Sequence, residues 1–184
     1  MDDVSSVLEL KNFECIADTE KKVMEFIHDI KNKEHCILIF QNDNMRDKIV
    51  NEFIDPKYAH NTITACFTHD VSKYSCNKLI TYDELAEKKK LLPNKISEFL
   101  ITVLDESYEK NTPRVACEDT AWFSEAGFFE EHQKIGNSLD KKIIDESAIL
   151  CCYNETKLND NQMDVVLDSR NYVILEKPFS VYRK

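Results

Sequence analysis

The chain has 184 residues, of which 42% are hydrophobic, two are Gly and four are Pro, a composition that favours one folded unit without linkers. Asp and Glu outnumber Lys and Arg by 34 to 24, and the charge of -10 argues against general binding to nucleic-acid backbones. Apolar runs fall short of the roughly 20 residues that span a bilayer, and the acidic start does not resemble a signal peptide. We therefore expect a cytoplasmic protein without a membrane segment.

Seven Cys, an odd number, are scattered through apolar runs, which is typical of thiols in a reducing compartment. The one basic run, Lys88-Lys89-Lys90, follows acidic residues and is interpreted as the solvated face of a helix.

Strands and helices alternate along the chain. The predicted strands are short apolar runs bounded by turn residues, and they cover residues 35–40, 62–68, 79–82, 114–117, 148–153, 172–175 and 179–182. The predicted helices carry apolar residues at three- and four-residue spacing, and they cover residues 18–31, 45–54, 84–90, 94–108, 128–144 and 160–167. A short apolar patch at residues 7–10 is a candidate edge strand, and Asp18 is a candidate helix cap.

This alternation predicts an α/β fold, a mainly parallel sheet covered by helices on both faces. Glu176-Lys177-Pro178 separates the last two predicted strands and indicates a hairpin, so we expect an antiparallel edge at the C-terminus.

The sequence lacks the glycine-rich loops that hold nucleotide phosphates. The two Gly residues stand at positions 127 and 136, in neither a G-x-x-x-x-G-K-[ST] nor a G-x-G-x-x-G pattern. Nucleotide binding through the phosphates is therefore not expected. A G-x-S-x-G nucleophile elbow is also missing from the sequence.

Glu118 and Asp119 follow the predicted strand 114–117, at the edge where open α/β sheets place ligands. Because adjacent strand residues point in opposite directions, we expect at most one of them to face a pocket, where it binds a cation or acts as a general base. The alternative is that Asp119, with Thr120 and Ser124, caps the next helix. Trp122 is equally suited to a core anchor and to the aromatic wall of a pocket.

Cys151 and Cys152 are adjacent in a predicted strand, so they face opposite sides and do not share a metal. The five His residues are dispersed, and we expect neither a metal nor a cofactor. His35 is interpreted as a hydrogen-bonded structural residue, with ligand binding or pH sensing as the alternative.

Three segments together resemble the sensory domain called MEDS, found in methanogens and methylotrophs and in a dichloromethane regulator. These segments are His35-Cys-Ile-Leu-Ile-Phe40-Gln-Asn, Arg114-Val-Ala-Cys-Glu118 with Trp122, and Ala148-Ile-Leu-Cys151-Cys-Tyr153-Asn154. The chain departs from the family pattern at Cys117, where Gly is usual, at Trp122, which stands one position late, and at Asn154, where Asp is usual.

The resemblance implies a RecA-like or KaiC-like sandwich without a phosphate loop, in an archaeal or bacterial sensory module. It covers residues 34–184, so residues 1–33 are expected to be an extension with an amphipathic helix. Such a stand-alone domain would bind a small molecule and signal through a protein partner or as a homo-oligomer.

From the sequence we therefore expect a non-catalytic sensory module whose ligand lies at the strand ends. The expected lining residues share that position, and they are Phe40, Gln41, Asn42, Glu118, Trp122, Tyr153 and Asn154, with His35 and Cys151 as structural or sensing residues. One alternative is a degenerate nucleotide-hydrolase-like enzyme that uses Glu118 as general base. The other is a redox or metal sensor based on Cys36, Cys66, Cys117 or Cys151.

Overall fold

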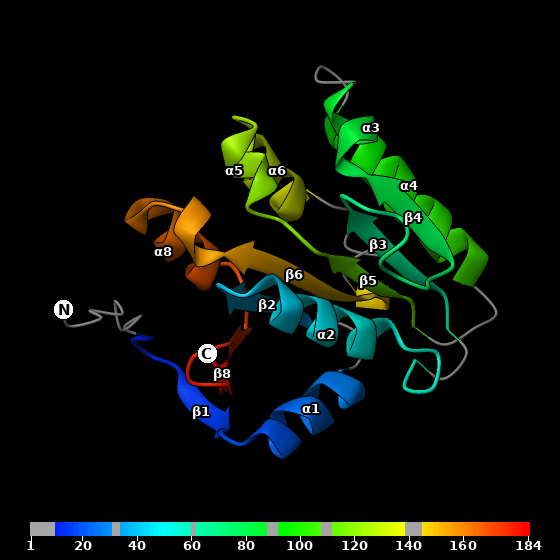
Figure 1. Cartoon of the computed structure of the whole chain (residues 1–184). Coiled ribbons are helices and arrows are strands. Elements are labelled where there is room, and N and C mark those ends of the chain that lie inside the picture. The colour runs from blue at the N-terminus through cyan, green and yellow to red at the C-terminus, as the bar shows by residue number, and fades with distance from the viewer. Residues whose placement is uncertain (1–9, 31–33, 60–61, 88–91, 108–111, 139–144) are drawn as a thin grey trace.

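A computed structural model describes residues 10–30, 34–59, 62–87, 92–107, 112–138 and 145–184. Those residues form a three-layer α/β sandwich around one eight-stranded sheet, with the strand order β1-β8-β7-β2-β6-β5-β3-β4 (Figure 1). The predicted fold class is therefore confirmed. The strands are β1 (Glu14–Ala17), β2 (His35–Phe40), β3 (Thr64–Thr68), β4 (Lys78–Thr81), β5 (Arg114–Cys117), β6 (Ala148–Asn154), β7 (Tyr172–Leu175) and β8 (Ser180–Arg183).

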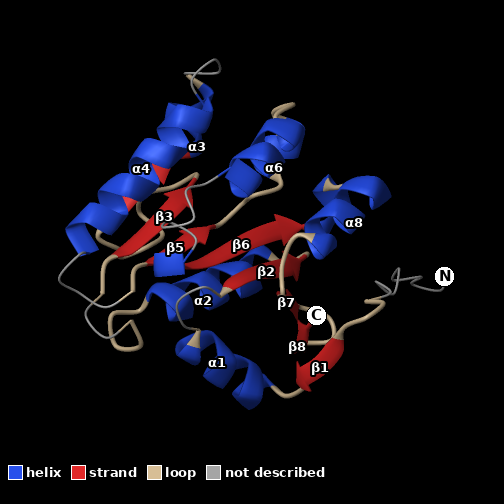
Figure 2. Ribbon diagram, turned by 180° about the vertical axis from the view of Figure 1, so that it is seen from behind, coloured by secondary structure: helices blue, strands red, loops and turns tan. Residues whose placement is uncertain are grey.

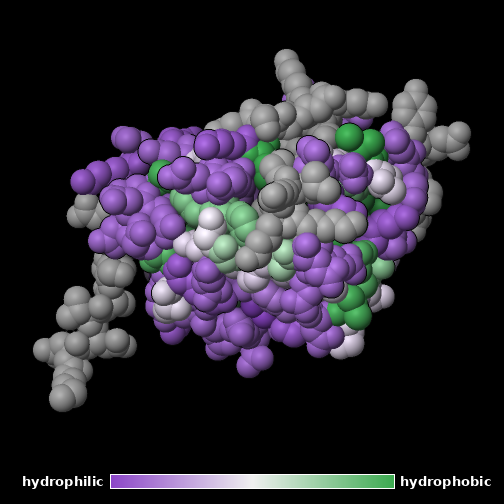
Figure 3. All heavy atoms as spheres, turned by 90° about the horizontal axis from the view of Figure 1, so that it is seen from above, coloured by the Kyte–Doolittle hydropathy of each residue, from purple (hydrophilic) through white to green (hydrophobic). Residues whose placement is uncertain are grey.

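Helices cover both faces of the sheet (Figures 1 and 2). One layer contains α1 (Glu20–Asp29) and α2 (Asp43–Ile54). The opposite layer contains α3 (Tyr82–Ala86), α4 (Leu92–Ser107), α5 (Trp122–Glu125), α6 (Phe129–Ser138) and α8 (Asp160–Asp168). Seen from above, the surface is mostly hydrophilic, with small hydrophobic patches (Figure 3).

The central strands are buried on both faces, as their continuous apolar sequences require. In β2 the side chains of Cys36, Leu38 and Phe40 pack toward α1 and α2. The alternate residues Ile37 and Ile39 pack toward the opposite layer. This period-two alternation gives the protein two cores, one on each side of the sheet.

Six strands, β2 to β7, run parallel, and β8 and β1 run antiparallel at one edge. The predicted hairpin joins β7 to β8, but the outermost strand at this edge is β1. The chain moves from β2 through β3 to β4 in one direction and from β4 through β5 and β6 to β7 in the other. This reversal makes the junction of β2 and β6 a topological switch point, the usual place for a ligand.

Several predicted boundaries at the N-terminal end are wrong. The edge strand at this end of the chain is Glu14–Ala17, which the sequence pattern did not predict. Of the predicted edge strand at residues 7–10, residues 7–9 lie outside the described residues and Leu10 is not in a strand. Thr19 caps α1 through its side chain, whereas Asp18 binds the ammonium group of Lys22 instead. An exposed edge strand carries little apolar signal, so the sequence pattern did not reveal it.

On the other side of the sheet, Tyr82 begins α3 rather than ending β4, and α3 ends at Ala86. Lys88-Lys89-Lys90 and the predicted helical residues 139–144 lie outside the described residues.

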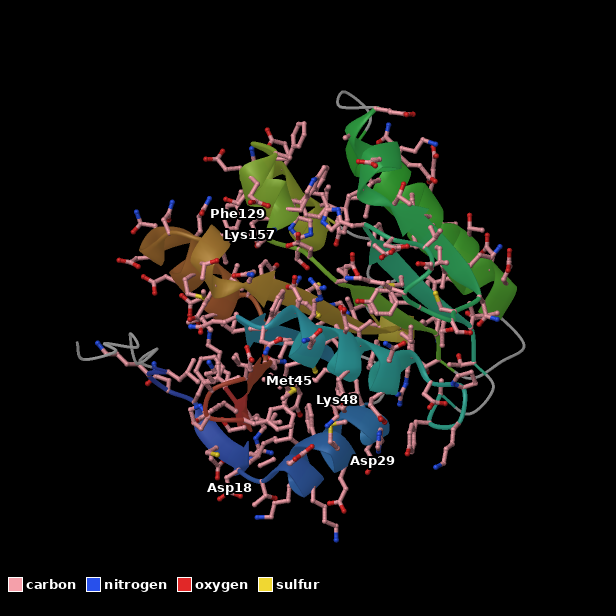
Figure 4. The ribbon with its side chains drawn as sticks, in the orientation of Figure 1. Asp18, Asp29, Met45, Lys48, Phe129 and Lys157 are labelled. Carbon is pink, nitrogen blue, oxygen red and sulfur yellow. The ribbon has the colours of Figure 1, made fainter. Side chains whose placement is uncertain are left out.

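The described part of the extension, residues 10–30, contributes to the same sheet and core as the rest of the chain. β1 pairs with β8, and Val23 and Ile27 of α1 are fully buried beside α2. Lys48 on α2 extends toward α1 (Figure 4) and forms a salt bridge of 2.8 Å with Glu20. Within the described residues, α-helices fall short of the length and apolar character required to cross a membrane.

Candidate functional site

Polar residues gather where the parallel strands end, as the sequence predicted. They surround a pocket of about 230 Å³ beside the β2–β6 switch point, which we call the carboxyl-edge pocket. Its lining residues come from the ends of β2, β3, β5 and β6 and from the segments that follow these four strands, and they are Phe40, Asp43, Arg46, His69, Lys73, Glu118, Asp119, Asn154 and Lys157.

Glu118 is buried at this edge, with 1% of its surface exposed. Its Oε1 accepts a hydrogen bond from the backbone N–H of His69. Its Oε2 accepts none from the described residues. The hydroxyl of Tyr74, which interacts with Glu118, donates its hydrogen bond to Asp47 (2.8 Å). A buried acceptor without a donor is costly, so this oxygen has an unmet need for a hydrogen bond.

Asp119 is also buried, at 3% exposure, and is held by two basic side chains. Its Oδ2 lies 3.0 Å from His69 Nε2 and 2.9 Å from Lys157 Nζ, while Oδ1 has no partner among the described residues. Burial alone would raise the pKa of Asp119, but the hydrogen bonds from His69 and Lys157 outweigh it and lower the pKa below 3.8. Asp119 is therefore ionised at neutral pH.

Both carboxylates line the pocket, so the expectation that only one would do so is wrong. β5 ends at Cys117, and Glu118 to Ala121 form a turn in which the strand alternation no longer applies. The capping alternative is also wrong, because α5 has no side-chain cap. Ser124 instead donates to Gln162 on α8 (3.1 Å).

The basic side chains of the pocket already have acidic partners. Arg46 bridges Asp43 (3.2 Å) and Asp47 (2.7 Å), and Lys73 also reaches Asp47 (3.3 Å). Lys157, between the end of β6 and α5 (Figure 4), contacts Glu125 as well as Asp119. The net charge of the pocket lining is close to zero when His69 is neutral, because three carboxylates balance three basic side chains. These are Asp43, Glu118 and Asp119, and Arg46, Lys73 and Lys157.

The start of α2, where a phosphate loop would lie, is occupied by the protein's own carboxylate. Glu176, just after β7, accepts hydrogen bonds from the backbone N–H groups of Gln41 (2.6 Å) and Asn42 (3.0 Å). Asn42 in turn caps α2 by accepting from the N–H of Asn44 (2.9 Å). The amides that could hold an external anion are therefore already used.

An aromatic chain connects the pocket to Trp122. The hydroxyl of fully buried Tyr82 accepts a hydrogen bond from the N–H of Asp119 (3.0 Å). The Tyr82 ring lies 4.5 Å from His69 and 5.1 Å from Trp122, measured between ring centroids. Trp122 therefore contacts a residue that is bonded directly to the pocket.

Of the residues predicted to bind a ligand, Phe40, Glu118 and Asn154 line the pocket. Gln41 and Asn42 lie beside it and bind Glu176. The remaining two, Trp122 and Tyr153, lie outside the pocket lining, in or against the opposite core.

His35 and Cys151 are remote from this pocket. His35 begins β2, at the amino end of the strand, and Cys151 faces the core beneath α4 and α6. Both line a separate internal cavity.

Six of the lining residues are missing from the predicted ligand-binding set: Asp43, Arg46, His69, Lys73, Asp119 and Lys157. His69 directly follows a predicted strand, and this position is what led to the prediction of Glu118. The same pattern could therefore have identified His69. Arg46 and Lys157 lie on helical turns after strands, where only tertiary packing decides the direction of a side chain.

Among the described residues, the His, Cys, Asp and Glu side chains form no group of three or more that could hold a metal ion. A larger, open groove of about 680 Å³ lies between α6 and α8 and includes Phe129 (Figure 4). We regard the carboxyl-edge pocket as the candidate site because it contains Glu118 and Asp119, two buried carboxylates that each have one oxygen without a donor among the described residues.

Comparison with known proteins identifies a fold but no family. Neither a family model nor a curated protein matches the sequence. The flagellar accessory protein FlaH from Methanocaldococcus jannaschii has a similar structure, with a TM-score of 0.51 and 12% identity over 88% of this chain and 80% of FlaH. The cytoplasmic domain of EssC matches 77% of this chain with a TM-score of 0.43 and 10% identity, and the match spans 31% of the EssC chain.

The similarity to FlaH agrees with the RecA-like α/β fold of this chain. The resemblance to the MEDS domain remains a prediction.

Proposed function

We propose that this chain is a non-catalytic sensory module that binds a small polar molecule in the carboxyl-edge pocket and signals through a protein partner. The observation that carries this proposal is the pair of buried carboxylates, Glu118 and Asp119, each with one oxygen that accepts no hydrogen bond within the described chain. A ligand that donates to these oxygens would remove an energetic penalty, so binding would be favourable.

The pocket favours a particular class of ligand. Its volume of about 230 Å³ is below the roughly 300–1,000 Å³ of drug-sized sites, so the molecule is smaller than a nucleotide. Because the bases have partners and the unmatched atoms are acceptors, the ligand should carry amino or hydroxyl donors. The balanced charge of the lining favours a neutral or zwitterionic molecule.

The absence of a phosphate loop from the sequence supports a non-catalytic role. Phosphoryl transfer depends mainly on positioning and neutralising phosphates. The backbone amides of Gln41 and Asn42 do not serve this purpose here, because they already donate to Glu176.

The test begins with native mass spectrometry of protein purified from its own host, which would identify a ligand retained on purification. Thermal unfolding and Trp122 fluorescence are then measured with amines, amino acids and polyols. We expect a ligand to raise the melting temperature and change the fluorescence, since Trp122 contacts Tyr82 and Tyr82 binds Asp119.

Glu118→Gln keeps the shape of the side chain but replaces one acceptor with a donor. We expect it to weaken ligand binding by roughly tenfold or more, equivalent to about 1.4 kcal/mol. The control is Glu98→Gln, at an exposed position on α4, which should leave binding unchanged. Equal affinity of Glu118→Gln and the unaltered chain would rule out this pocket as the ligand site.

A degenerate hydrolase is the second candidate, because Glu118 Oε2 is buried and lacks a donor in a pocket that also contains Arg46 and Lys157. Such a group could act as a general base toward a bound water. Nucleotide hydrolysis above background that is lost in Glu118→Gln would favour this candidate over the sensory module.

A further inference from the structure

Two thiols that are far apart in the sequence meet on one face of the sheet. Cys117 on β5 and Cys151 on β6 are paired in register on adjacent parallel strands, and both side chains belong to the core beneath α4 and α6. Both residues also line the same internal cavity.

The spacing of this pair suits a disulfide bond. Neighbouring strands lie about 4.7–4.9 Å apart, and the Cα atoms of disulfide-bonded residues are usually about 4.4–6.8 Å apart. Because paired positions on adjacent strands project to the same face, the two sulfurs can bond without a shift in strand register.

The pair borders an internal cavity of about 50 Å³, separate from the carboxyl-edge pocket. A water molecule needs roughly 10–15 Å³ of such space, so the cavity has room for a molecule slightly larger than water. The rest of its lining is apolar apart from His35, His132 and Arg170.

The two thiols differ in acidity. The neighbouring Cys117 thiol and the positive charge of Arg170 lower the pKa of Cys151 although burial opposes them, whereas the Cys151 thiol and burial both raise the pKa of Cys117. The thiolate is the reactive form of Cys, so Cys151 is the nucleophile of the pair. On the other face of the sheet, burial raises the pKa of Cys36 and Cys152 and makes them unreactive.

We propose that Cys117 and Cys151 form a peroxide-sensitive pair that closes into an intramolecular disulfide. The Cys151 thiolate attacks one oxygen of a hydroperoxide, the O–O bond breaks, and the departing oxygen takes a proton to give water or an alcohol. The sulfur of Cys117 then attacks the resulting sulfenic acid, the S–O bond breaks, and a second water leaves with the Cys117 proton. Two thiols lose two electrons, and the peroxide gains them.

The test uses peptide mapping of the full chain after treatment with hydrogen peroxide, without reducing agent. We expect the peptide that contains Cys117 to be linked to the peptide that contains Cys151, with an intact mass lower by two hydrogen atoms. A thiol reductant should restore the original mass. This measurement needs no variant, so a folding defect cannot confuse it.

Variants then show which cysteine residues form the disulfide. Cys117→Ser should abolish the link and leave Cys151 as a sulfenic acid that dimedone traps. Because Cys152 is in the same peptide as Cys151, Cys152→Ser is the matched control and should keep the link. Cys15→Ser removes the exposed thiol that could join two molecules.

A peroxide-treated chain that retains all its free thiols, or a link that persists in Cys117→Ser or disappears in Cys152→Ser, would overturn the proposal. So would oxidation of Cys151 to sulfinic acid without any link to Cys117. Each result is independent of whether the carboxyl-edge pocket binds a ligand.

Discussion

At the scale of the residue, Arg114 shows how a buried charge can serve stability rather than function. Its guanidinium donates to three backbone carbonyls, those of Phe53 (2.9 Å), His28 (2.6 Å) and Ile30 (3.1 Å). These carbonyls lie near the C-terminal ends of α2 and α1, where helices leave acceptors unsatisfied and favour a positive charge. Arg114 therefore ties both helices to β5.

Arg114→Ala should lower the free energy of unfolding by about 3 kcal/mol, because it leaves buried carbonyls without donors. Arg183→Ala, which removes only an exposed salt bridge to Glu14, is the control and should change stability by less than about 1 kcal/mol. Urea unfolding followed by circular dichroism measures both. Similar effects of the two substitutions would contradict the role assigned to Arg114.

His132 makes stability depend on pH. Burial, together with the positive charge of Arg170, lowers the pKa of His132 from 6.5 to about 4. His132 therefore binds a proton at higher pH in the unfolded chain than in the folded chain. The stability that neutral His132 contributes is complete above pH 6.5 and is lost as the pH falls toward 4.

His132→Phe keeps an aromatic ring stacked on Phe123, whose ring centroid is 4.2 Å away. We expect the unaltered chain to lose roughly 2–3 kcal/mol of stability relative to this variant between about pH 7 and pH 4.5. Urea unfolding of both proteins across this range tests the expectation. A stability difference that stays constant with pH would show that His132 has the same pKa in the folded and unfolded chains.

At the scale of the element, α2 depends on a residue that is more than a hundred positions away. Its first turn is capped by Asn42, and the amides just before it are bound by Glu176 from the end of β7. A carboxylate near a helix N-terminus also interacts favourably with the helix dipole. Glu176 thus joins the ends of two adjacent strands, β2 and β7.

Glu176→Ala should lower the free energy of unfolding by about 1–2 kcal/mol, since two amides lose a charged acceptor. Lys177→Ala, at the next and exposed position, should have little effect. Thermal unfolding of the two variants checks this prediction. An unchanged melting temperature in Glu176→Ala would mean that water replaces the carboxylate without cost.

At the scale of the whole molecule, the sheet and both cores extend across the domain boundary expected near residue 34. Val23 and Ile27 of the extension are fully buried in the core that also contains Ile49 and Phe53 of α2. β1 covers the edge of β8, which would otherwise offer unpaired backbone groups to other chains.

We therefore expect a chain of residues 34–184 to be unstable or aggregated, while one of residues 10–184 stays folded and monodisperse under the same conditions. The shorter chain loses a helix with buried apolar side chains and leaves donors of Arg114 without partners. Circular dichroism and size-exclusion chromatography compare the two. A cooperative unfolding transition in 34–184 would show that residues 34–184 form an independent domain.

The sequence by itself determined the layered fold and the edge that carries the candidate site. The continuous apolar run of β2 and the helical spacing after it require a buried parallel strand followed by a covering helix. Glu118 was found from sequence because a strand end is a local feature.

The tertiary structure alone decided which side chains share the site and which thiols meet. His69, Arg46 and Lys157 reach Glu118 and Asp119 from separate loops and helices, and Cys117 meets Cys151 only through the register of β5 and β6. Local patterns record periodicity and capping within a few residues, whereas these contacts depend on strand order and on the direction of each connection. β1 was missed for the same reason, because its position is set by pairing with β8 rather than by an apolar pattern.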